Sequence, residues 1–180
     1  MAVRRKLIRK TVEELLEENR IKEPPVRVEE ISENCGLPVI RQNVENTEIS
    51  GFIFRSKGKA VIGVNPSHPE VRQRFTIAHE LGHYLMHPPG TDDVHIDKDF
   101  EIRFRDNLSS QGTDTNEREA NFFAAELLMP FKFIQADLEK LGKADIAEGK
   151  LLEELAKRYE VSTQSLLFRL VNLGILSSQF

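Results

Sequence analysis

Two histidines four residues apart, in the pentapeptide His79-Glu80-Leu81-Gly82-His83, constrain this chain more than any other feature. They lie in a segment, residues 69–86, whose apolar residues recur every three or four positions, which predicts a helix. One helical turn, about 6 Å of axis, then separates His79 from His83, so both imidazoles can reach one zinc ion. Glu80 projects toward the same place as a general base for hydrolysis. Two surface histidines on an amphipathic helix are the alternative.

A hydrolytic zinc site has three protein ligands and an open position for water, so a third ligand is needed. His87 continues the spacing but lies about 12 Å along the axis from the first histidine, which indicates a helix-end or supporting role. Residues 115–129 read as a second helix that ends before Pro130. We predict Glu117 of this helix as the third ligand. Glu119 is the alternative, although it is rotated well away from that side.

The remaining pattern predicts an α+β fold, in which a small antiparallel or mixed sheet precedes the His-Glu-x-x-His helix and a helical segment follows. Alternating apolar residues place strands at Val39–Val44, Ser50–Phe54 and Ala60–Val64. This is the arrangement of a zincin-like metallopeptidase domain. An edge strand beside the cleft could pair with an extended substrate, or the sheet could simply support the helix.

We expect a metallopeptidase core over residues 1–130, including an N-terminal amphipathic helix. Residues 131–180 form a C-terminal helical segment with helix-turn-helix-like spacing, packed on the core. Its exposed polar side chains are few, so packing or partner docking is favoured over DNA binding.

A polar, irregular stretch joins the two active-site helices, over residues 88–114. Such stretches often bind substrate or act as lids. The oxyanion that develops on the cleaved carbonyl also needs stabilisation. Five side chains are open candidates for that role: Tyr84, His87, His95, Arg103 and Arg105.

Composition points to a cytoplasmic protein. Cys35 is the only cysteine, so the chain forms no internal disulfide and fits a reducing compartment. No apolar run is long enough to span a membrane. The net charge of −4 argues against direct nucleic-acid binding, and the basic residues near the N-terminus are expected on a helix docked on the domain or a partner.

The central blocks, Arg72 to His87 and Glu117 to Pro130, closely resemble the ImmA/IrrE family of zinc metallo-endopeptidases. The resemblance covers most of the chain and implies His79, His83 and Glu117 as Zn²⁺ ligands and Glu80 as catalytic base. It also implies a bacterial or phage endopeptidase of narrow specificity that cleaves a helix-turn-helix transcriptional repressor, which derepresses phage, mobile-element or stress genes. Only about two dozen residues precede Pro24, so the repressor is expected to be a separate chain.

The rival interpretation is a non-proteolytic zinc-containing module that binds and regulates a transcription factor, alone or as part of a toxin–antitoxin-like pair. Glu80 favours the enzyme, because a purely structural zinc site has no use for a general base beside its ligand. The sequence leaves open the repressor, its cleavage site, the activating signal and the oligomeric state.

Overall fold

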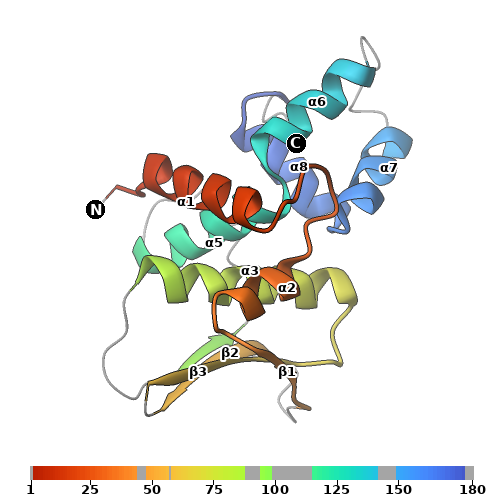
Figure 1. Ribbon diagram of the computed structural model, residues 1–180. Helices are drawn as coiled ribbons and strands as arrows, with labels where there is room; N and C mark the ends of the chain where they lie inside the picture. The colour runs from red at the N-terminus through yellow and green to blue at the C-terminus, as the bar shows by residue number, and fades with distance from the viewer. Residues whose placement is uncertain are drawn as a thin grey trace.

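The computed structural model describes residues 2–43, 48–56, 58–87, 94–98, 115–141 and 149–176, with the backbone alone for 94–98. The chain combines helices with a small sheet, as predicted (Figure 1). The helices are α1 (Arg5–Glu18), α2 (Val28–Asn34), α3 (Glu70–Met86), α5 (Thr115–Leu128), α6 (Phe131–Leu141), α7 (Gly149–Tyr159) and α8 (Thr163–Asn172). The strands are β1 (Val39–Arg41), β2 (Ile49–Ser56), β3 (Lys59–Val64) and β4 (Val94–Lys98).

The sheet is mixed and has the strand order β1-β3-β2-β4. Strand β2 pairs antiparallel with both β3 and β4, and β1 pairs parallel with β3. Gly58 lies between β2 and β3 with φ +75°, a left-handed conformation that glycine adopts without strain. The first strand is shorter than predicted and ends at Arg41; the predicted end at Val44 lies outside the described residues.

Strand β4 corrects the prediction of an irregular stretch between the active-site helices. Its backbone pairs with β2, with Ile96 opposite Phe52 and Val94 opposite Phe54. The sequence carried a weak signal, since Val94 and Ile96 alternate with polar residues. That alternation is short, and it is flanked by prolines, glycine and aspartates that favour loops.

Helix α3 lies directly over the sheet, and α5 packs on its other side (Figure 1). Every residue from Phe75 to His83 is buried. An amphipathic helix would bury only one stripe, but α3 is enclosed by two layers and buries its polar residues as well. Gly82 makes the close approach to α5, because a Cβ there would lie 3.0 Å from the Phe123 ring and 3.2 Å from the Ala120 Cα.

Helix α1 docks on the domain, as its apolar stripe predicted. Ile8, Val12 and Leu15 are buried, and α1 contacts α5. Its basic residues therefore belong to a helix that packs on the domain, not to a free N-terminal arm. Within the described residues no helix combines the length and the apolar character that a bilayer span requires.

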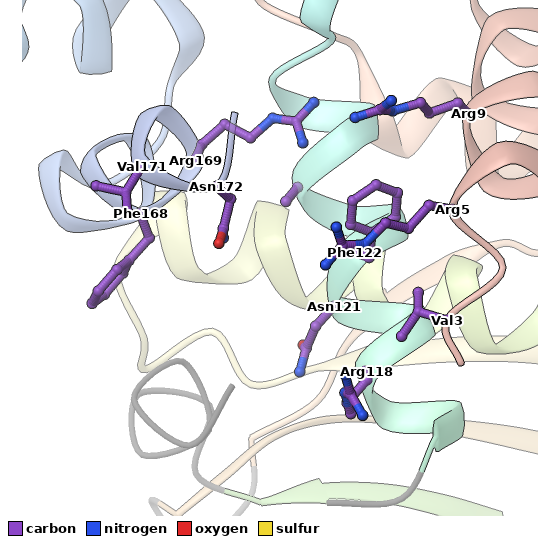
Figure 2. A pocket seen from close by; sticks show the side chains of 11 residues that line it. Val3, Arg5, Arg9, Arg118, Asn121, Phe122, Phe168, Arg169, Val171 and Asn172 are labelled. Atoms are coloured by element: carbon purple, nitrogen blue, oxygen red, sulfur yellow. The ribbon is translucent and has the colours of Figure 1, made fainter. Parts of the chain in front are cut away.

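The C-terminal helices contact the core through a buried arginine. Ser162 caps α8 by accepting a hydrogen bond from the Ser165 backbone N–H at 3.0 Å. Arg169 extends from α8 toward α5, where its Nε donates to the Met129 carbonyl at 3.1 Å (Figure 2). Arg169 is only 3% exposed, which removes it from any exposed recognition surface on α8. The division of the chain near residue 130 stays a prediction.

Candidate metal centre

Helix α3 presents two histidines with their ring nitrogens almost in contact. The Nε2 atoms of His79 and His83 lie 3.0 Å apart, and the ring centroids lie 4.6 Å apart. Both residues are buried. Two imidazole lone pairs at this distance repel one another unless a proton or a cation lies between them, so the pair is arranged for a shared positive charge.

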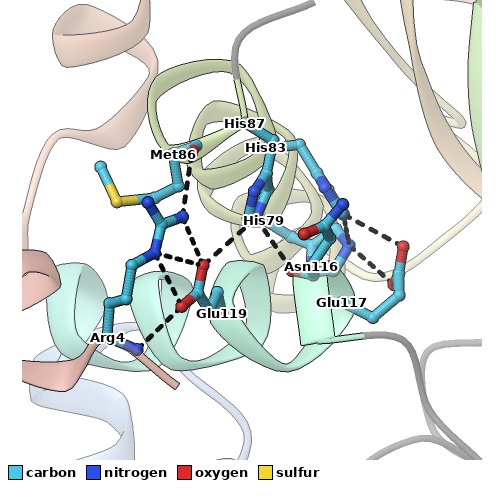
Figure 3. A network of polar contacts seen from close by, with 8 residues as sticks. All are labelled: Arg4, His79, His83, Met86, His87, Asn116, Glu117 and Glu119. Atoms are coloured by element: carbon cyan, nitrogen blue, oxygen red, sulfur yellow. Dashed lines mark hydrogen bonds and ion pairs between the residues drawn. The ribbon is translucent and has the colours of Figure 1, made fainter. Parts of the chain in front are cut away.

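Helix α5 brings a carboxylate to the same point (Figure 3). Glu117 Oε1 lies 3.2 Å from His83 Nε2, and Oε2 lies 3.6 Å from His79 Nε2. The donor atoms of these three residues all fall within 4.8 Å of one another. The contact of α3 with α5 thus assembles a cluster from positions 38 residues apart in the sequence (79 to 117).

The spacing of this cluster suits zinc. Zn–N and Zn–O bonds of about 2.0–2.2 Å in a tetrahedral site separate the ligand atoms by roughly 3.3–3.6 Å. The three separations here run from 3.0 to 3.6 Å. Two imidazoles and one carboxylate are also the ligand set of known hydrolytic zinc sites that keep a position open for water. The cluster therefore fits a metal ion without rearrangement.

Glu119, the alternative ligand, pairs with Arg4 and lies outside the three-residue cluster. Its carboxylate receives hydrogen bonds from the Arg4 side chain, the shortest at 2.6 Å, and from the Arg4 backbone N–H at 2.8 Å. These hydrogen bonds lower the pKa of the Glu119 carboxyl, although burial opposes them. The geometry favours Glu117 over Glu119 as a ligand. Sequence reasoning missed Arg4, because a basic residue next to the chain start carries no signal of a distant buried partner.

His87 lies at the end of α3, outside the three-residue cluster. Its Nε2 is 3.1 Å from the Asn116 carbonyl and 3.8 Å from Glu119, and its ring centroid is 5.6 Å from that of His83. Burial, the largest cause, and the neighbouring His83 lower the pKa of the His87 imidazole. A neutral His87 can support the cluster through α5 without binding the same ion.

Glu80 follows His79 on α3 and is fully buried. A carboxylate in this environment interacts strongly with nearby charge because water is excluded. The oxyanion-stabilising residue stays open. Tyr84 is half-buried, with the Arg55 guanidinium 5.8 Å from its ring centroid. The side chain of His95 and all of Arg103 and Arg105 lie outside the described residues.

Cys35 does not contribute to this chemistry. It follows the last residue of α2 and is half-buried. Burial, and then the charge of Glu18, raise the pKa of its thiol. The thiolate needed for nucleophilic attack is therefore disfavoured.

Comparison with known proteins connects this site to metalloproteases. A family model described as the IrrE N-terminal-like domain matches residues 32–171. The radiation response metalloprotease IrrE of Deinococcus radiodurans is 38% identical over 110 residues, which cover 61% of this chain and 30% of that protein. Its namesake in Deinococcus deserti is also 38% identical over 110 residues, covering 35% of that protein. The chain thus spans about a third of the length of these curated relatives.

Two further relatives extend the comparison. An uncharacterized immunity region protein 2 of Bacillus phage phi105 is 29% identical over 124 residues, which cover 69% of each protein. A solved structure of a Mycobacterium tuberculosis transcriptional regulator matches 91% of this chain and 46% of its own, with a TM-score of 0.59 and 16% identity, and shows a shared fold alone. Since the family model covers most of the sequence, the chain belongs to the ImmA/IrrE family of metallopeptidases.

Proposed function

We propose that this protein is a zinc-dependent endopeptidase that cleaves a helix-turn-helix transcriptional repressor in the cytoplasm. The observation that carries the proposal is the convergence of His79, His83 and Glu117 within 4.8 Å of one another, with the buried Glu80 next to the first histidine on α3. Membership of a metallopeptidase family supports it. The repressor as substrate rests on the family resemblance.

In this proposal the three clustered side chains hold zinc, and Glu80 handles the proton. When bound, zinc would act as a Lewis acid that polarises the scissile carbonyl and lowers the pKa of water. Glu80 accepts a proton from the attacking water, whose oxygen bonds to the carbonyl carbon. As the carbon–nitrogen bond breaks, Glu80 returns that proton to the leaving amine, so the carboxylate is regenerated. Burial of Glu80 holds its carboxylate in one place for both transfers.

The sheet offers a place for the substrate backbone. Within the described strands, β1 and β4 form the two edges, so each has one row of backbone groups without a strand partner. An extended peptide can pair with such an edge. Pairing of the substrate with one of these edges stays a prediction.

The experiment is intact-mass analysis of the helix-turn-helix repressor encoded nearest this gene, after incubation with zinc-loaded protein. Glu80→Gln is the test variant, because it keeps the side-chain shape and removes the base. Glu70→Gln is the matched control, since Glu70 is exposed in the first turn of the same helix. We expect one defined cut with wild type and Glu70→Gln and none with Glu80→Gln. Association of the two proteins without a cut by wild type would favour the non-proteolytic binding module.

A further inference from the structure

A second polar site lies between α1, α5 and α8, on the face of α5 that does not contact α3. It is a pocket of about 120 Å³ lined by residues of all three helices. Four of its lining residues are arginines: Arg5 and Arg9 from α1, Arg118 from α5, and Arg169 from α8. Figure 2 shows Arg9 and Arg169 reaching toward one another from opposite sides of α5, with Arg5 beside Phe122.

The positive charge of this pocket is not balanced. Glu126 pairs with Arg169 at 2.7 Å and more weakly with Arg9 at 3.4 Å. In the part of the chain that the structure describes, Arg5 and Arg118 form no ion pair. Among the described residues, four guanidinium groups lie against one carboxylate, a surplus of three positive charges, although the whole chain carries −4. A concave site with this surplus attracts anions.

A buried amide in the pocket has no hydrogen-bond partner among the described residues. Asn121 is only 4% exposed, and its Oδ1 makes no hydrogen bond with any described residue. Native proteins rarely leave such a group unpaired, so the observation points to a missing ligand atom. Asn121 lines the pocket together with Arg118 and Phe122 of the same helix. The ligand would therefore carry a hydrogen-bond donor, such as a hydroxyl, beside its anionic oxygens.

Three of the four arginines are held in position before any ligand arrives. The guanidinium carbons of Arg5 and Arg9 lie 5.5 and 5.8 Å from the centroid of the Phe122 ring, within the range of cation–π attraction. Arg169 is fixed by Glu126 and by the Met129 carbonyl. Such pre-organised guanidinium groups match the oxygens of a phosphoryl group, to which they donate in pairs.

The volume limits what fits. The pocket of about 120 Å³ has room for one phosphoryl group that carries a short hydroxylated chain. We propose that the pocket between α1, α5 and α8 binds the phosphoryl group of a small hydroxylated phosphate monoester. The bound anion would contact α1, α5 and α8 together. Its contact on α5 is Arg118, which directly follows the candidate ligand Glu117. The site goes beyond the proposed proteolytic function, and its test needs no substrate cleavage.

The test is isothermal titration of the zinc-loaded full chain with glycerol 3-phosphate and with inorganic phosphate, at constant ionic strength set by chloride. Arg5→Gln and Arg118→Gln are the test variants, because neither breaks an ion pair among the described residues. Arg27→Gln is the control; Arg27 is an exposed arginine beside α2 that pairs only with Glu30 among those residues. We expect saturable binding that each test variant weakens at least tenfold and the control leaves unchanged.

If wild type and both test variants bind phosphate equally, the proposal is overturned. The phosphate then binds outside this pocket, for example at the metal. Heat that does not saturate, or that chloride reproduces, would overturn it as well. A glutamate-rich peptide that competes and binds more tightly than glycerol 3-phosphate would reassign the pocket to a protein partner. If the wild-type protein binds phosphate in this pocket but does not cleave the repressor, the proposed protease function is contradicted and the proposed phosphate site is supported.

Discussion

Arg4 joins the end of α3 to α5 through a partly buried ion pair with Glu119. Its Nη2 lies 2.6 Å from Glu119 Oε2 and also donates to the Met86 carbonyl at 3.0 Å (Figure 3). The Glu119 side chain is 2% exposed, whereas that of Arg4 is 47% exposed. The residue just before α1 therefore holds together the two helices that carry the candidate ligands.

Replacing Arg4 by Ala should destabilise the fold more than replacing its neighbour Arg5 by Ala. Arg4→Ala leaves a buried carboxylate without its cation, which costs about 2 kcal/mol after allowance for the exposed half of the pair. Arg5 forms no ion pair in the described parts of the chain and makes one exposed cation–π contact with Phe122, so its loss should cost no more than about 1 kcal/mol. Urea unfolding of both variants measures the difference. Equal midpoints would show that the pair with Glu119 does not stabilise the contact.

Metal content should separate Glu117 from Glu119. Glu117→Ala removes one of three clustered donors, so the purified protein should retain far less zinc than wild type. Glu119→Ala should keep nearly one zinc per chain and lose stability only, because Glu119 faces Arg4. Plasma mass spectrometry after dialysis gives both values. The reverse pattern would make Glu119 the third ligand.

Gly82→Ala should test how closely α3 and α5 must approach. Alanine favours a helix over glycine by about 1 kcal/mol, which alone would stabilise α3. The new Cβ would lie 3.0 Å from a carbon of the Phe123 ring and 3.2 Å from the Ala120 backbone. Overpacking of a well-filled contact costs about 1–3 kcal/mol, so we expect a net loss. A lower melting temperature with weaker zinc retention is the expected result, and a stabilised variant would contradict it.

The sequence predicted those parts of the fold whose signal is local. The helices that carry His79, His83 and Glu117 were identified from apolar spacing and from the proline that follows the second helix. Glu117 could be chosen over Glu119 because helix geometry alone rotates them apart. In the structure, the first lies against the histidines and the second against Arg4.

Long-range contacts could not be predicted in the same way. Arg4 and Arg169 both resemble surface residues, since nothing near them in the sequence shows the buried Glu119 or Glu126 that they meet. Strand β4 depends on pairing with β2, and that pairing outweighs its loop-like neighbours. Burial of α3 on all sides also follows from two layers that are distant in sequence.

Asp137 should make the contact of α6 with α7 sensitive to acid. Burial favours its neutral form, but hydrogen bonds from Arg158 Nε at 2.9 Å and Tyr159 Oη at 3.0 Å outweigh burial and lower its pKa below the ordinary 3.8. A lowered carboxyl pKa in the folded state gives stability that is present above the unfolded pKa and lost as the pH falls through the folded pKa. Wild type should therefore exceed Asp137→Asn by about 1–3 kcal/mol at pH 7.

That advantage should shrink as the pH falls below about 5, where the unfolded carboxyl begins to take up a proton. Urea unfolding of both proteins between pH 3 and 7 measures this difference in the free energy of unfolding. Because both proteins carry the same metal cluster, its own response to acid is subtracted out. Glu139→Gln, an exposed change on the same helix, should show almost no such difference at any pH. A constant difference between wild type and Asp137→Asn would mean that packing, and not the charge of Asp137, stabilises the contact between the two helices.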